Sequence, residues 1–64
     1  MEFAEYQHRL EKKHGKSIEQ IIRTIYIDED YGPATGAQEL GIPRQVFMHF
    51  VYEFDLKSDK LQRL

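Results

Sequence analysis

The apolar residues at the start of the chain recur at helical spacing. Phe3, Tyr6 and Leu10 are separated by three and four residues, which places them on one face of a helix. Gly15 follows, and glycine commonly ends a helix because it readily adopts the left-handed conformation. This pattern predicts a first helix over about residues 2–14.

A second helix is predicted over about residues 18–29. Ser17 stands three residues before Gln20, the spacing of a capping box at a helix N-terminus. The apolar face that follows consists of four isoleucines, Ile18, Ile21, Ile22 and Ile25. Isoleucine also suits strands, but the strict alternation of a strand is absent.

Glycine and proline divide the second half of the chain. Pro33 and Pro43 each suit the first turn of a helix, and Gly41 suits the end of one. A short helix is therefore predicted over about residues 33–40, and another from the turn at Gly41 to about residue 54, with Phe47 and Phe50 facing inward. Residues 55–64 are interpreted as a tail, either a frayed last turn or a short helix.

Length and composition limit the fold and the location. A chain of 64 residues can close only one hydrophobic core. It has no cysteine, so neither disulfides nor thiolate zinc sites can hold it together. No apolar run approaches the roughly 18 residues of a membrane-spanning helix, and the first residues lack the pattern of a signal peptide. We expect a cytoplasmic protein with no membrane partner.

Catalytic and metal-binding patterns are missing from the sequence. His8, His14 and His49 do not have a metal-ligand spacing, and no cysteine nucleophile or glycine-rich phosphate loop occurs. The acidic run at residues 28–30 is typical of a solvated helix end, because three consecutive residues on a helix do not face one point. We therefore expect no enzyme, no catalytic residue, no metal and no cofactor.

The spacing from Ile21 to about Lys57 resembles a known family. The stretch IIRTIY, Ala37 eleven residues after Tyr26, ELGIPRQVF and a closing FDLK follow the pattern of homeodomain-like helix-turn-helix modules of bacteria and phages. Such modules occur in small regulators, in transposase and recombinase heads and in phage packaging subunits. Taken with the chain length and the four predicted helices, this gives one all-α domain over residues 1–64, a small bundle of four helices, in which the resemblance implies a DNA-binding helix-turn-helix at about residues 33–54.

Three positions depart from the family pattern. Gly36 stands where a bulky aliphatic residue is usual, so another side chain must fill the core there, with Tyr31 or an aromatic residue of the first helix as the expected one. Tyr52 and Glu53 stand where the family's recognition helix usually carries Lys or Arg, which removes phosphate contacts.

The resemblance makes the fourth predicted helix the reader of a DNA major groove. The residues expected to read bases point away from Phe47 and Phe50, and they are Arg44, Gln45, Met48, His49 and Tyr52. Arg44 has the donor geometry for a guanine edge and Gln45 for an adenine edge. The alternative is that Arg44 and Gln45 are ordinary solvated residues.

Charge is unevenly distributed along a chain whose formal net charge is −2. Residues 28–55 carry six acids, Asp28, Glu29, Asp30, Glu39, Glu53 and Asp55, against the single base Arg44. Residues 8–16 carry four bases, Arg9, Lys12, Lys13 and Lys16, against the single acid Glu11. We expect these four bases to contact phosphates, which supply most non-specific affinity for DNA. The alternative is a solvated face with pairs such as Glu5 with Arg9.

Met48, His49 and Tyr52 also have the composition of a protein interface, which Val46 could join. Our leading hypothesis is a duplex-DNA-binding transcriptional regulator or accessory factor that acts as a homodimer or within a larger complex. The alternative hypothesis is an interaction module, an inhibitor or adaptor, that binds a regulatory, transcription or replication protein and not DNA. A third interpretation is that these side chains simply pack against the first helix.

Overall fold

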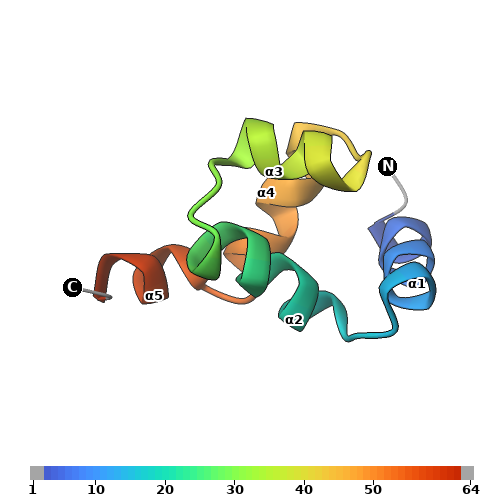
Figure 1. Cartoon of the computed structure of the whole chain (residues 1–64), viewed down its shortest axis with the longest axis horizontal. Coiled ribbons are helices and arrows are strands. Elements are labelled where there is room, and N and C mark those ends of the chain that lie inside the picture. The colour runs from blue at the N-terminus through green and yellow to red at the C-terminus, as the bar shows by residue number, and fades with distance from the viewer. Residues whose placement is uncertain (1–2, 63–64) are drawn as a thin grey trace.

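The computed structural model describes residues 3–62, and within that range the chain contains helices and no strand (Figure 1). The elements are α1 (Phe3–His14), α2 (Ile18–Arg23), the π-helical segment η1 (Thr24–Asp28), α3 (Pro33–Leu40), α4 (Arg44–Glu53) and α5 (Leu56–Gln62). The predicted all-α class is confirmed. The predicted start of the first helix at Glu2 lies outside the described residues.

The molecule is elongated, with extents of 33 × 22 × 19 Å. In Figure 1, α1 lies at one end of the long axis and α5 at the other, with α2, α3 and α4 between them. None of the described helices is both long enough and apolar enough to cross a bilayer.

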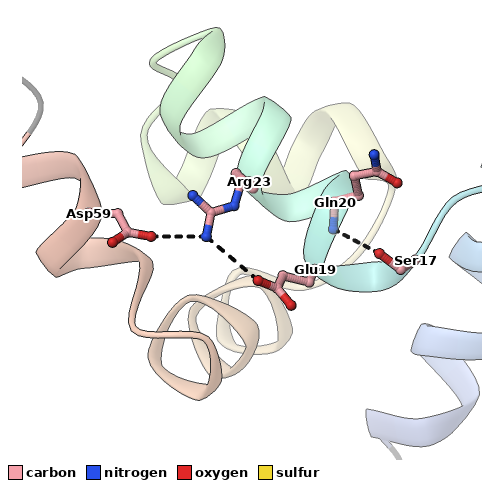
Figure 2. A network of polar contacts seen from close by, with 5 residues as sticks. All are labelled: Ser17, Glu19, Gln20, Arg23 and Asp59. Atoms are coloured by element: carbon pink, nitrogen blue, oxygen red, sulfur yellow. Dashed lines mark hydrogen bonds and ion pairs between the residues drawn. The ribbon is translucent and has the colours of Figure 1, made fainter.

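The predicted Ser17 cap is present at the start of α2. The Ser17 hydroxyl accepts a hydrogen bond from the backbone N–H of Gln20 at 3.2 Å, which Figure 2 shows. A second cap comes from α1, where a carboxylate oxygen of Glu11 accepts from the backbone N–H of Ile18 at 2.8 Å. Glu11 thus joins α1 to α2, a role that the sequence pattern did not indicate because its partner lies on another helix.

The second predicted helix changes its winding at Thr24. In η1 the backbone N–H of Glu29 donates to the carbonyl of Thr24, five residues earlier, at 2.9 Å. The wider π turn places three consecutive residues, Ile25, Tyr26 and Ile27, in the core. A regular α-helix would turn at least one of them toward solvent. Asp30 then ends the helical run in the left-handed region, at φ 59°.

The tail predicted for residues 55–64 contains a fifth helix, which bears out the short-helix alternative for this segment and makes the predicted count of four helices one too few. A helix as short as α5 is not stable alone, and tertiary contacts hold it. Leu56 is fully buried, and Asp59 accepts from Arg23 of α2 at 2.9 Å (Figure 2). Lys60 pairs with Asp30 at 3.1 Å and lies 4.2 Å from the ring centroid of Tyr26. The partners of α5 come from distant positions, which periodicity within residues 55–64 does not reveal.

The turn between α3 and α4 has the predicted glycine conformation. Gly41 has φ 69° and ψ 35°, and the next residue, Ile42, donates its N–H to the carbonyl of Ala37 at 3.0 Å. This is the hydrogen bond of a Schellman motif, which closes a helix and redirects the chain. Pro43 then precedes α4 in an extended conformation.

The ring of Phe47 fills the space left by Gly36, so the expectation that Tyr31 or a residue of α1 would do so is wrong. A Cβ atom on Gly36 would lie 2.7 Å from two ring carbons of Phe47 and 3.1 Å from Ile25 Cγ2. Phe47 has no exposed surface, and its ring meets that of Tyr26 edge-on at 6.2 Å. The absence of a side chain at Gly36 therefore allows α4 and η1 to approach α3 closely.

We predict that Gly36→Ala destabilises the protein, although alanine has a more favourable helix propensity than glycine by about 1 kcal/mol. The new methyl group would overlap the Phe47 ring, and overpacking of this kind costs roughly 1 to 3 kcal/mol. Urea unfolding measures the change. In a Phe47→Leu background the same substitution should be neutral or stabilising, and a clear gain in stability from Gly36→Ala alone would contradict the packing described.

Candidate functional site: the outer face of α4

The helix α4 has a buried face and an outer face. Its buried residues are Val46, Phe47, Phe50 and Val51. Opposite them, Gln45, Met48 and Tyr52 follow one another at i, i+3 and i+7 and form what we call the open stripe. Gln45 is exposed, Met48 is half-buried and Tyr52 is 65% exposed.

Val46 does not belong to this outer face. It has no exposed surface, so the suggestion that it could join a protein interface is wrong. Val46 lies four residues before Phe50 and therefore points to the same side of the helix as that buried ring.

The remaining predicted readers lie on the two flanks of the open stripe. At 3.6 residues per turn, Arg44 falls on one flank and His49 on the other. Arg44 is exposed and begins α4, whose first turn has no side-chain cap. Arg44 forms no ion pair or side-chain hydrogen bond with the described residues, so it is free to meet a partner beside Gln45.

His49 is occupied by contacts within the protein. Its ring stacks on Phe3 of α1, with centroids 3.7 Å apart and planes 8° from parallel. It also meets Phe50 edge-on at 5.2 Å, and its Nε2 lies 3.2 Å from a carboxylate oxygen of Glu53. For His49, the interpretation that side chains of this helix pack against the first helix is the one the structure shows.

Ion pairs separate the basic residues into two groups. Arg23 pairs with Glu19 at 3.6 Å as well as with Asp59 (Figure 2). Lys60 pairs with Asp30, so both bases are neutralised where α5 meets α2 and η1. By contrast, the predicted phosphate-contacting residues are all exposed and form no ion pair within residues 3–62; they are Arg9, Lys12, Lys13 and Lys16. Arg9 lies over the ring of Tyr6, 5.1 Å from its centroid, instead of pairing with Glu5.

Among the acidic residues of positions 28–55, Glu53 borders the open stripe beside Tyr52, whereas Asp30, Glu29 and Glu39 have neighbours on other elements. Glu53 is paired with His49 on one flank, and Asp30 is paired with Lys60 of α5. Glu29 and Glu39 line an open groove together with His14 and Lys16, beside the connection from α1 to α2. The acidic sum of this segment therefore overstates the negative charge around Gln45 and Met48.

Neither a metal site nor a match to known proteins adds to these observations. Within the described part of the chain, no group of three or more His, Asp or Glu side chains could hold a metal ion. No protein-family model matches the sequence, and no significant match is found among curated proteins or solved structures.

We predict that Phe3 and His49 are energetically coupled. Stacked aromatic pairs contribute about 0.5 to 1.5 kcal/mol beyond the area they bury, so the double variant Phe3→Ala/His49→Ala should lose less stability than the sum of the single variants. Urea unfolding of the four proteins measures this difference. The matched control is His49→Ala with Leu61→Ala on α5, which should be additive within about 0.5 kcal/mol. Additivity of the first pair as well would show that α1 does not rest on α4 through this stack.

Proposed function

We propose that this protein binds duplex DNA as a small helix-turn-helix transcriptional regulator or accessory factor. In this proposal α3, the turn at Gly41 and α4 form the helix-turn-helix, and α4 lies in the major groove. The observation that carries it is the open stripe, which begins beside the exposed Arg44 directly after the left-handed turn.

The polar groups at the start of α4 suit base edges. A major groove about 12 Å wide admits an α-helix, and recognition helices present their first turns to the bases. Arg44 can donate two hydrogen bonds to guanine, and Gln45 can both donate to and accept from adenine. Both side chains are exposed in the structure.

The bases of α1 supply the charge that α4 lacks. Each Lys or Arg placed against a phosphate releases counterions, which gives affinity that depends on salt. The Phe3–His49 stack sets the N-terminal end of α1 beside the middle of α4. At 1.5 Å per residue, Lys12 and Lys13 lie roughly 14 Å from Phe3 along the axis of α1. This distance is comparable to the width of the major groove.

We predict that binding to random-sequence duplex weakens steeply with salt. The slope of log affinity against log salt should fall by about 1 for each lysine removed in Lys12→Ala/Lys13→Ala. Arg44→Ala should chiefly reduce discrimination between sequences. Fluorescence anisotropy at several salt concentrations measures both effects.

The matched control is Lys57→Ala, because Lys57 is also exposed but lies on α5, at the far end of the molecule from α1 (Figure 1). Its slope should equal that of wild type. Absence of any salt-dependent affinity in wild type would end the DNA proposal. If Lys57→Ala lowered the salt slope as much per lysine as Lys12→Ala/Lys13→Ala does, the result would contradict a specific phosphate contact by α1.

The second proposal is a protein-interaction module that binds a regulatory, transcription or replication protein. The observation that favours it is Tyr52, one of the large apolar side chains that remain exposed, next to Met48 and Glu53. Exposed tyrosines are frequent hot spots of protein interfaces, and an acid beside one opposes contact with phosphate.

In this second case we predict that the tagged protein recovers a stoichiometric protein from its native host. Tyr52→Ala should abolish the recovery, because loss of one hot spot weakens binding by about 2 kcal/mol or more. Lys57→Ala serves as the control that should retain the partner. Recovery of nucleic acid without a stoichiometric protein would contradict the interaction module.

A further inference from the structure

The open stripe contains an amide and a thioether as neighbours. Gln45 and Met48 are three residues apart on one face of α4, and neither carries charge. Both are close to the exposed N-terminal end of the helix, whereas His49 is engaged by Phe3 and Glu53. Within the open stripe these two side chains lie closest to the N-terminal end of α4, and Tyr52 follows one turn after Met48.

Their chemistry matches the two halves of an A·T base pair in the major groove. Adenine presents an acceptor at N7 and a donor at N6, which one glutamine amide can satisfy together. Thymine presents a methyl group at C5, and an apolar side chain is its natural contact. Methionine is flexible and polarisable, so its thioether can pack against such a methyl group; it offers no donor for the acceptors of guanine and only a weak acceptor for the N4 amino group of cytosine.

The spacing of the two side chains also fits neighbouring base pairs. Three residues of an α-helix correspond to a rise of about 4.5 Å along its axis. Successive base pairs are about 3.4 Å apart, so Gln45 and Met48 span roughly one base-pair step.

We infer that Gln45 and Met48 together recognise an A·T-containing step, with the Gln45 amide on adenine and the Met48 thioether against the C5-methyl group of an adjacent thymine. This inference rests on the proposed DNA-binding function and names the base chemistry that the site takes. Arg44, on the flank of the stripe, contacts a guanine beside that step.

The experiment begins with selection of preferred duplexes from a random pool, followed by atomic substitution in the selected site. Replacing thymine by deoxyuridine removes only the C5-methyl group, and replacing adenine by 7-deaza-adenine removes only the N7 acceptor. Wild type should lose about fourfold in affinity on deoxyuridine duplex, the effect of one buried methyl group. It should also lose affinity on the 7-deaza-adenine duplex.

Two variants assign each effect to its side chain. Met48→Ala should bind thymine and deoxyuridine duplexes equally, and Gln45→Ala should no longer distinguish adenine from 7-deaza-adenine. Lys57→Ala, on α5 and outside the proposed interface, is the matched control and should keep both sensitivities. The wild-type comparison needs no substitution in the protein, so it remains decisive even if a variant folds poorly.

The outcomes separate this inference from the function on which it rests. Selected sites without an A·T step, or wild-type binding that is unchanged by deoxyuridine, would overturn the inference and leave DNA binding intact. Salt-dependent binding without sequence preference would also overturn it, because no base would then be read. A complete absence of duplex binding would overturn the proposed function and the inference together.

Discussion

The contact of the Phe47 ring with Gly36 is the constraint on which the arrangement of the helices depends. Because Gly36 has no side chain, the ring lies where a Cβ atom would otherwise be, and Ile25 of η1 closes the same space. This contact fixes how far α4 is rotated about its own axis. With Phe47 turned inward, Val46, Phe50 and Val51 follow it into the core, and the open stripe is left outside. The candidate functional surface is thus a consequence of core packing.

Much of the local structure could be predicted from the sequence because it depends on residues close together in the chain. The Ser17 cap, the left-handed Gly41 and the inward Phe47 each follow from rules that involve only a few neighbours. The features that sequence reasoning left open or missed depend on distant partners. The helix α5 needs Arg23 and Asp30, and the position of His49 needs Phe3, from the other end of the chain.

The π turn of η1 was missed for a different reason. The isoleucines and Tyr26 fit an α-helical stripe, and only the need to bury Ile25, Tyr26 and Ile27 together favours the wider winding. That need arises because η1 lies between α3 on one side and α5 on the other, contacting Gly36 through Ile25 and Lys60 through Tyr26. The candidate surface was easier to predict, since every residue of the open stripe follows from the phase of one helix.

The polarity of α4 decides which of its ends can face an anionic partner. The N-terminal end carries Arg44 together with the positive end of the helix dipole, and the C-terminal end carries Glu53 with the negative end. The stack of Phe3 on His49 also places α1 beside the middle of the helix. The last turn of α4 therefore disfavours a polyanion and the first turn favours it. In a DNA complex, the phosphates would lie nearer to Arg44 and Gln45 than to Tyr52. The same polarity means that a protein partner centred on Tyr52 would need to be neutral or basic, which distinguishes the two kinds of partner by charge alone.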